Sequence, residues 1–235
     1  MNNTIAIIKN AFDIGFCNNA LAKMTNKQRG AVGQFEAGTV VEQTRKSNVC
    51  FVNGIINNTD LFTPLITKVS EINKQYFGFD LNEPETIQLT EYDSAEQGEY
   101  KPHEDDADWV GLVPERFDPR GVRKLSVVIQ LSDSKSYEGG ELIIETINSE
   151  EKFKLNAGEI ILYPSSYLHA VSQVDSGYRV VCVGWIESYV KSAEQREYLF
   201  DLDAGARGIL AKYGMSDEVD LIFKSYSNLL RILGN

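Results

Sequence analysis

The sequence predicts a mainly β fold, a double-sheet β-sandwich or jelly roll, with helices on both sides of it. From Glu85 onwards the chain consists of short runs rich in β-branched and other apolar residues, which is the pattern of strands. Turn signals such as YEGG, NAGE and VDSG separate these runs at intervals of roughly ten residues, typical of two packed sheets. Apolar residues at helical spacing occur before and after this region, so we expect helices around a β core.

Two helices are expected ahead of the β core. Residues 13–24, DIGFCNNALAKM, predict a short helix, and residues 59–78 predict a longer one. In the longer segment, large apolar residues recur three or four positions apart and form one face of a helix. They are Leu61, Leu65, Val69, Ile72 and Tyr76.

The β core is expected to be built from short strands joined by tight turns. Gly139 and Gly140, in YEGG, are predicted to be turn glycines between two of these strands. Tyr100 and Tyr163 are expected to pack in the interior. The strand-like segments are 85–92, 124–132, 141–147, 151–155, 159–163, 168–174 and 178–188.

The chain becomes helical again after the last strand. Residues 192–214 and 216–235 predict two helices, of which the second is amphipathic and capped by Ser216. We therefore expect two units: residues 1–188 form the β domain with its N-terminal helices, and residues 189–235 form a C-terminal helical extension. The amphipathic pattern allows the extension either to cap the β domain or to form a homodimer.

Composition excludes several classes of partner. The 235 residues carry a net charge of -11, which argues against nucleic acid or an anionic membrane as a main partner. The cysteines, Cys17, Cys50 and Cys182, form no CxxC motif and favour a reduced, intracellular protein. The N-terminus lacks a signal-peptide pattern and no run of 18 apolar residues occurs, so we expect a cytoplasmic protein without a spanning helix.

The chain has only two histidines, and one of them stands beside a carboxylate. His103 lies in KPHEDDADW with Asp105 two positions later, and on an extended segment such positions face the same side. Together with His169 they would form a 2-His-1-carboxylate set, which binds non-heme Fe(II) and leaves coordination positions open. The His-x-Asp pair alone also suits a polar loop, so the prediction depends on the surroundings of His169.

The segment around His169 predicts a β-hairpin. The runs on both sides of DSG are strand-like, and a three-residue loop that ends in glycine is a common connection. This register places His169 opposite Val183 and Gln173 opposite Arg179. Roughly 13 Å along the strand separates His169 from Arg179, enough for a small dicarboxylate, which arginine binds bidentately. The residues predicted to share one face are His169, Arg179, Val181, Val183 and Trp185.

These segments together resemble the iron(II)- and 2-oxoglutarate-dependent dioxygenases of the prolyl-4-hydroxylase superfamily, and most narrowly the PKHD-type hydroxylases. The resemblance is carried by YKPHEDDA, RKLSVVIQLSDSKSYEGGELII, LNAGEIILYPSSYLHAVSQVDSGYRV and WIESYVKSAEQREYLFDLD with a later YSNLLR. It extends from about Thr90 to Arg231. It implies a double-stranded β-helix core of the jelly-roll or cupin-like kind, with flanking helices.

The resemblance also implies a ligand set and an activity. His103, Asp105 and His169 would bind Fe(2+), Arg179 would bind the distal carboxylate of 2-oxoglutarate, and Tyr92 would line the co-substrate pocket. The enzyme would use O2, with L-ascorbate as a further cofactor, and would hydroxylate a C–H bond with release of succinate and CO2. The implied substrates are prolyl or other peptidyl residues, free amino acids or small molecules.

Three further residues have two interpretations each. Ser126 and Gln130 alternate with apolar residues on one strand, so they face either the substrate cavity or solvent. Trp185 either walls the substrate pocket or packs in the core. Glu104 and Asp106 are charged where relatives often carry uncharged residues, which bears on substrate preference.

Three alternatives remain beside the dioxygenase. A hydrolase that uses Ser165 or Ser166 with His169 lacks the GxSxG nucleophile elbow and leaves Arg179 unused. A structural zinc site requires four ligands, usually with closely spaced cysteines. A non-catalytic jelly-roll module would bind a ligand without turnover, and measured succinate production separates it from the enzyme.

Overall fold

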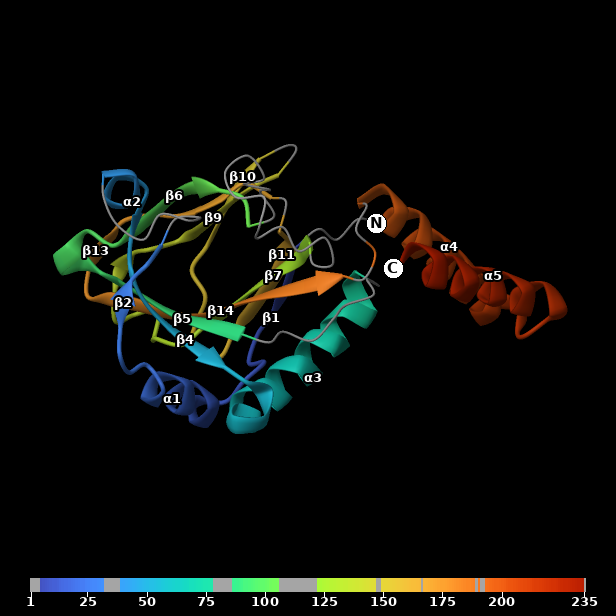
Figure 1. Ribbon diagram of the computed structural model, residues 1–235, viewed down its shortest axis with the longest axis horizontal. Coiled ribbons are helices and arrows are strands. Elements are labelled where there is room, and N and C mark those ends of the chain that lie inside the picture. The colour runs from blue at the N-terminus through green and yellow to red at the C-terminus, as the bar shows by residue number, and fades with distance from the viewer. Residues whose placement is uncertain are drawn as a thin grey trace.

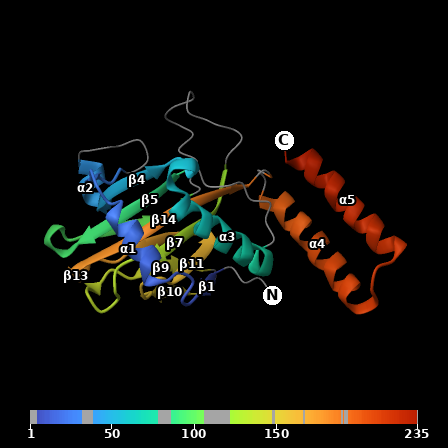
Figure 2. The ribbon, with the colours of Figure 1, turned by 90° about the horizontal axis from the view of Figure 1, so that it is seen from below.

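The computed structural model confirms a mainly β molecule flanked by helices (Figure 1). It describes residues 5–31, 39–77, 86–105, 122–146, 149–165, 167–188, 190 and 193–234. Two antiparallel sheets face each other and form the centre of the molecule, and two N-terminal helices lie along one of them. A pair of C-terminal helices stands to one side of the sheets (Figures 1 and 2).

The larger sheet has seven strands, in the order β1-β11-β7-β14-β5-β4-β2. All its pairs are antiparallel, and neighbours in the sheet come from distant parts of the chain. Its central strand β14 pairs with β7 on one side and β5 on the other. The strands are β1 (Ala6–Ile8), β2 (Gln28–Arg29), β4 (Asn48–Asn53), β5 (Thr86–Asp93), β7 (Val122–Gln130), β11 (Ile160–Pro164) and β14 (Tyr178–Ser188).

The smaller sheet has five strands, in the order β10-β9-β12-β6-β3. A separate two-stranded ribbon joins β13 and β8 near its end. The strands are β3 (Arg45–Lys46), β6 (Glu99–His103), β8 (Glu138–Gly139), β9 (Leu142–Glu145), β10 (Glu150–Phe153), β12 (His169–Val171) and β13 (Val174–Ser176).

The side chains of strand β14 show that the two faces of the larger sheet pack into two different cores. Val180, Cys182 and Ile186 point to one side, into a core shared with the N-terminal helices. Val181 and Val183 point to the other side, into the space between the two sheets. Because side chains alternate along a strand, this sheet has one face in each core. The second core is the one that surrounds the candidate site.

Helices α1 (Ile14–Ala22) and α3 (Thr59–Tyr76) cover the outer face of the larger sheet. Asp13 caps α1, since its carboxylate accepts a hydrogen bond of 2.8 Å from the Phe16 amide. The predicted apolar face of α3 is confirmed, with Phe62 added to it. Shorter helical segments are α2 (Thr39–Thr44), η1 (Ile55–Asn58) and η2 (Ser94–Glu96).

The two C-terminal helices pack on each other as a hairpin. They are α4 (Ala193–Tyr213) and α5 (Asp217–Leu233), and Ser216 caps α5 as predicted. The separation of residues 1–188 and 189–235 into two domains remains a prediction. In the part of the chain that the structure describes, no helix has the length and apolar character needed to cross a membrane.

The predicted hairpin between His169 and Arg179 is wrong. Strand β12 pairs with β6 and β9, whereas β14 pairs with β5 and β7, so the chain passes from one sheet to the other between them. His169 therefore lies opposite His103 and Ile144 rather than Val183, and Arg179 lies opposite Tyr92 rather than Gln173. The predicted three-residue loop is also wrong, because Asp175 and Ser176 belong to β13, but Gly177 has the predicted left-handed φ, at 69°.

The turn glycines of YEGG are confirmed. Gly139 and Gly140 have positive φ values of 70° and 66°, which residues other than glycine rarely adopt. A Cβ on Gly139 would also lie 2.1 Å from the backbone oxygen of Gln173. This close contact brings β8 against the residue that precedes β13.

Candidate metal and co-substrate site

His103, Asp105 and His169 converge between the two sheets. His103 ends β6 and His169 begins the neighbouring β12, which places their rings 4.2 Å apart between centres. Asp105 follows two residues after His103, with its carboxylate oxygens 3.8 Å from His103 Nε2 and 3.4 Å from His169 Nε2. One ligand atom from each residue lies within 4.8 Å of the others, so the three can share one divalent ion.

Both imidazoles are oriented by backbone carbonyls. His103 Nδ1 lies 2.9 Å from the oxygen of Lys101, and His169 Nδ1 lies 2.9 Å from the oxygen of Tyr167. A carbonyl can only accept, so each Nδ1 carries the proton and each Nε2 offers a lone pair toward Asp105. Hydrogen bonds of this kind fix the tautomer of metal-binding histidines.

Asp105 is held by residues of the larger sheet. Its amide donates to the oxygen of Ser165 at 3.0 Å, just beyond β11. Ser126 on β7 donates its hydroxyl to Asp105 Oδ2 at 2.6 Å, and the Ser126 and Ser165 hydroxyls lie 3.0 Å apart. A hydrogen bond from Trp185 on β14 also reaches the Asp105 carboxylate. The acid of the triad therefore bridges both sheets.

The electrostatics keep His103 and Asp105 in the protonation states that bind metal. Burial, followed by the neighbouring His169, lowers the pKa of His103 to about 4. Burial alone would raise the pKa of Asp105, but the two histidines and the hydrogen bonds from Ser126 and Trp185 lower it more, so its pKa lies below the usual value. At neutral pH the site contains a neutral His103 and a carboxylate.

Arg179 faces this triad from the opposite sheet. It is only 3% exposed, and its Nε donates to Gln130 Oε1 at 3.2 Å. Gln130 in turn donates to the Ser132 hydroxyl at 2.9 Å, so a side-chain network fixes the guanidinium. Within the described ranges, Arg179 forms no ion pair with a carboxylate, which suits a group that receives an anionic ligand.

A cavity between the sheets connects the triad with Arg179. Tyr92 and Trp185, predicted for the co-substrate and substrate pockets, both line it, as do Val181 and Val183. Four of the five residues predicted to share one face thus lie together on β14, and His169 reaches the same cavity from the facing sheet. His169 and Arg179 thus reach the same cavity from two facing sheets, and not from the two strands of one hairpin.

Ser126 and Gln130 face the cavity side of β7, but their polar atoms are engaged. Ser126 bonds to Asp105, and Gln130 bonds to Arg179. The structure thus places them behind the residues that would bind metal and co-substrate, and their part in substrate binding remains a prediction. Ser165, the hydrolase alternative, is buried with its hydroxyl against Ser126.

Tyr163 and Tyr100 both pack between the sheets, as predicted, and each also contacts a histidine of the triad. Tyr163 is buried and meets the His169 ring edge-on, with 5.1 Å between ring centres, so its packing role is confirmed. Tyr100 lines the cavity and stacks on His103 at 3.6 Å. Glu104 is exposed, whereas Ser166 and Asp106 lie outside the described residues.

Sequence reasoning missed Arg45, which also lines the cavity. Arg45 lies on the two-residue strand β3 and is 6% exposed. Two residues are too few to give a strand pattern, so no local signal marked it. Its partner Tyr100 in the register of β3 and β6 was assigned to packing.

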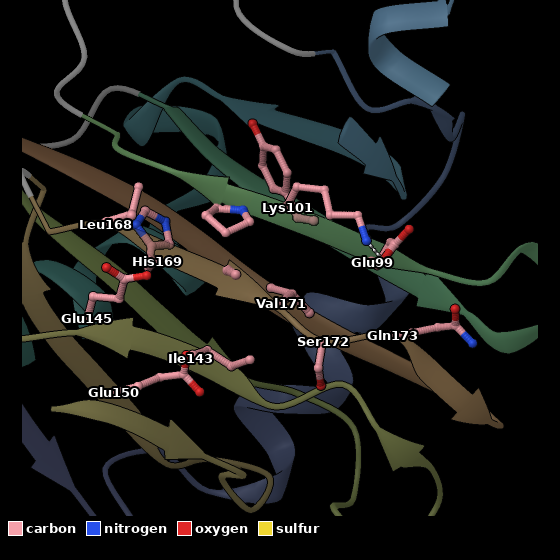
Figure 3. A pocket seen from close by; sticks show the side chains of 13 residues that line it. Glu99, Lys101, Ile143, Glu145, Glu150, Leu168, His169, Val171, Ser172 and Gln173 are labelled. Atoms are coloured by element: carbon pink, nitrogen blue, oxygen red, sulfur yellow. Dashed lines mark hydrogen bonds and ion pairs between the residues drawn. The ribbon is translucent and has the colours of Figure 1, made fainter. Parts of the chain in front are cut away.

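A second hollow lies on the outer face of the five-stranded sheet, and His169 also borders it (Figure 3). Its walls are Lys101, Ile143 and Ser172, from three neighbouring strands, and Lys101 pairs with Glu99. Ile143 and Ser172 alternate with residues that face the cavity between the sheets, so they point away from it. The register shift of β6 between Tyr100 and His103 turns Lys101 to the same outer side. The metal ligands belong to the inner face.

A family match covers the region that contains the triad and Arg179. Residues 87–187 match the family model of the 2OG-Fe(II) oxygenase superfamily. The predicted family resemblance is confirmed.

The chain is also 73% identical over 119 residues to a PKHD-type hydroxylase of Prochlorococcus marinus strain AS9601, over 51% of this chain and 54% of that protein. A PKHD-type hydroxylase of strain MIT 9312 is 71% identical over 119 residues, with the same shares. The chain thus spans about half the length of these two hydroxylases.

Solved oxygenase structures share the fold. A Pseudomonas putida prolyl-4-hydroxylase matches 79% of this chain and 92% of its own, with a TM-score of 0.58 at 15% identity. A Trichoplax adhaerens prolyl hydroxylase, solved with a peptide fragment of the hypoxia inducible factor oxygen degradation domain, matches 84% of this chain and 87% of its own, with a TM-score of 0.60 at 16% identity. The predicted double-stranded β-helix core is confirmed.

The residues present fit the metal that this superfamily uses. Two imidazole nitrogens and one carboxylate oxygen form a three-ligand set, the arrangement of non-heme Fe(II) sites with open positions. Within the described residues, no cysteine belongs to the cluster, which separates it from a structural zinc site. The superfamily match and the donor set together indicate Fe(2+) with 2-oxoglutarate as co-substrate.

Proposed function

We propose that the protein is an Fe(II)- and 2-oxoglutarate-dependent dioxygenase that hydroxylates a C–H bond and releases succinate and CO2. The observation that carries the proposal is one cavity that joins a 2-His-1-carboxylate triad to a buried arginine. The superfamily match over residues 87–187 supports the same activity. A non-catalytic binding module would not need this combination of ligands.

Each residue has a defined part in this reaction. His103, Asp105 and His169 would hold Fe(2+) on one side and leave its other positions for 2-oxoglutarate and O2. Arg179 would bind the distal carboxylate of 2-oxoglutarate through its planar fork, with Tyr92 packed nearby, 5.8 Å from ring centre to guanidinium carbon. With iron, 2-oxoglutarate and O2 bound, the centre supplies an oxidant that hydroxylates C–H bonds. L-ascorbate would keep the iron reduced between turnovers.

The cavity wall governs what reaches the metal. Trp185, Val181 and Val183 line it beside the triad and would exclude water from the reacting centre. Gln130 would keep Arg179 aimed at the co-substrate, and Ser126 would keep Asp105 aimed at the metal. No further catalytic acid or base is assigned among the described residues.

The proposed substrate is a prolyl or other amino-acid residue, free or in a peptide. Support comes from the prolyl-4-hydroxylase of P. putida and the T. adhaerens enzyme with its peptide, which share the fold. A net charge of -11 supports the absence of nucleic acid or membrane as partner. A cytoplasmic location and a homodimer built through α4 and α5 belong to the same proposal.

The test is anaerobic visible absorption of the metal-free protein. Addition of Fe(II) and then 2-oxoglutarate should give a charge-transfer band that requires both, and Asp105→Ala and Arg179→Ala should lose or weaken it. The band reports a chelated complex in the site, and succinate release in air then reports turnover. A folded, iron-loaded protein without the band at saturating 2-oxoglutarate would sink the proposal and favour the ligand-binding module.

A further inference from the structure

A second buried arginine stands in the wall of the proposed active-site cavity. Arg45 is 6% exposed and lies on the edge strand β3, opposite Tyr100 on β6. Its guanidinium carbon is 4.7 Å from the centre of the Tyr100 ring, and that ring stacks on His103. The guanidinium is therefore one aromatic ring away from a proposed iron ligand. Binding of iron and 2-oxoglutarate leaves this residue without a role.

Hydrogen bonds and close packing fix the position of the Arg45 guanidinium. Arg45 Nε donates to the Ser47 hydroxyl at 2.7 Å, and Nη1 donates to the Ala31 oxygen at 2.9 Å. Gly30 packs so closely that a Cβ there would lie 2.6 Å from Arg45 Nε. These contacts hold the group in one orientation, yet both of these acceptors are neutral.

Neither cavity arginine has a negative partner among the residues that the structure describes. Arg45 and Arg179 donate to hydroxyl, amide and carbonyl oxygens, and neither forms an ion pair there. A buried charge is costly unless it is paired. Arg179 would be paired by 2-oxoglutarate, so in the described part of the cavity Arg45 is the cation that still lacks an anion.

The charge balance of the loaded cavity leads to the same conclusion. A metal dication and a 2-oxoglutarate dianion cancel each other, and metal-bound histidines are neutral. The Asp105 carboxylate offsets one guanidinium, so one positive charge remains with two arginines in the wall. A substrate with one negative charge would neutralise it, and a guanidinium matches a carboxylate in shape and hydrogen bonding.

We propose that Arg45 binds a free carboxylate of the substrate. The substrate class is then an amino acid or a chain-terminal residue with an unblocked α-carboxylate, held close to the C–H bond that reacts. The inference rests on the proposed dioxygenase function. It adds a specificity-determining residue that the superfamily match does not cover, since Arg45 lies outside residues 87–187.

The test measures binding to protein loaded with Fe(II) and 2-oxoglutarate without oxygen. The probes are matched acids and amides: L-proline, L-prolinamide, N-acetyl-L-proline and N-acetyl-L-prolinamide, with the same four forms of alanine and lysine. Calorimetry should give a Kd at least tenfold lower for the acid than for its amide in at least one pair. Free and N-acetylated forms separate a free amino acid from a chain terminus.

Two variants and a control assign the preference to Arg45. Arg45→Gln should bring the acid-to-amide ratio close to one and leave 2-oxoglutarate binding unchanged. Gly30→Ala keeps the charge but crowds its seat, so it should also reduce the ratio. Lys46→Gln removes the next cation along β3, a half-buried side chain paired with Glu99 at 3.4 Å, and should preserve the ratio.

The outcomes separate this inference from the proposed function. If no acid in the panel binds better than its amide, or if Arg45→Gln keeps the preference, carboxylate recognition by Arg45 is overturned. Weaker 2-oxoglutarate binding in Arg45→Gln with no change in the acid preference would assign Arg45 to the co-substrate instead. If the wild-type protein forms no Fe(II)–2-oxoglutarate band, the proposed function itself fails.

Discussion

The two facing sheets hold their halves of the site in different ways. On the five-stranded sheet, His103 and His169 are oriented by the backbone carbonyls of the residues two positions before them in the chain. On the seven-stranded sheet, Arg179 is oriented by the side chain of Gln130, which comes from a neighbouring strand. The imidazoles therefore depend on local chain geometry, whereas the arginine depends on a side-chain network. Asp105 combines both, because it follows β6 but bonds to Ser126 on β7.

This contrast indicates where mutations should separate the two functions of the site. A change near Asp105 should affect the metal, and a change near Arg179 should affect 2-oxoglutarate, although all these residues border one cavity. Metal affinity and co-substrate affinity are separate measurements. Variants on the two sides therefore test whether the halves are independent.

The greatest loss is expected from removal of the residue that joins the halves. Asp105→Ala removes the only carboxylate of the described triad and should abolish Fe(II) binding and succinate formation. Anaerobic iron titration and succinate assays measure both. Glu104→Ala is the matched control, because Glu104 is an exposed acid next to the site. Equal losses in the two variants would mean that net charge, rather than coordination, holds the metal.

The second largest effect is expected when Arg179 loses its planar guanidinium. Arg179→Lys keeps the charge but cannot bind a carboxylate bidentately, and we expect the KM for 2-oxoglutarate to rise on the order of tenfold or more. Metal affinity should stay within about twofold, since Arg179 donates to Gln130, whereas Ser126 and backbone carbonyls orient the triad. A steady-state titration of 2-oxoglutarate checks the first value. An unchanged KM would remove Arg179 from the co-substrate site.

A smaller effect on the metal side is expected from the serine behind Asp105. Ser126→Ala deletes the 2.6 Å hydrogen bond to Asp105 Oδ2 and should weaken Fe(II) binding by roughly 10- to 100-fold, as for other outer-shell partners. The KM for 2-oxoglutarate at saturating iron should change little. Ser134→Ala, at an exposed turn, is the control. If Ser126→Ala altered only the co-substrate constant, the separation of the two halves would be wrong.

Much of the site could be predicted from sequence because its residues lie in recognisable local patterns. His103 and Asp105 are two positions apart, and His169 and Arg179 lie in long strand-like runs. Strands β5, β7 and β14 and helices α3 and α5 were also predictable, because each is long enough to show its period, and β11 was predictable as a continuous apolar run. Local periodicity thus identifies the parts.

Strand pairing could not be predicted in the same way. The predicted hairpin assumed that runs adjacent in sequence pair, but the chain changes sheets between β12 and β14. Strands of two or three residues, such as β1, β2 and β3, carry too few side chains to show alternation. Arg45 was missed for this reason, since its position depends on the pairing of β3 with β6.

The triad should also make the metal-free protein sensitive to acid. The pKa of His103 is lowered from 6.5 to about 4 in the folded state, so between these values the unfolded chain binds more protons. Stability is therefore retained above pH 6.5 and falls as the pH decreases toward 4. His103→Asn lacks this titration, and its melting temperature should decrease less over that range, by about a few degrees. Melting curves of both proteins that stay parallel from pH 7 to pH 4.5 would contradict the assigned pKa.

The smallest effect is expected on the arginine side, from the glutamine that orients Arg179. Gln130→Leu keeps the volume of the buried side chain but removes the acceptor of Arg179 Nε. We expect the KM for 2-oxoglutarate to rise about threefold to tenfold, the cost of one hydrogen bond to a charged group. Iron affinity should not change, which is the reverse of the result expected for Ser126→Ala.

Gln130→Glu sharpens the test, because it restores an acceptor but places a carboxylate against the guanidinium. That variant should raise the KM for 2-oxoglutarate more than Gln130→Leu does, since the new carboxylate competes with the co-substrate for the same fork.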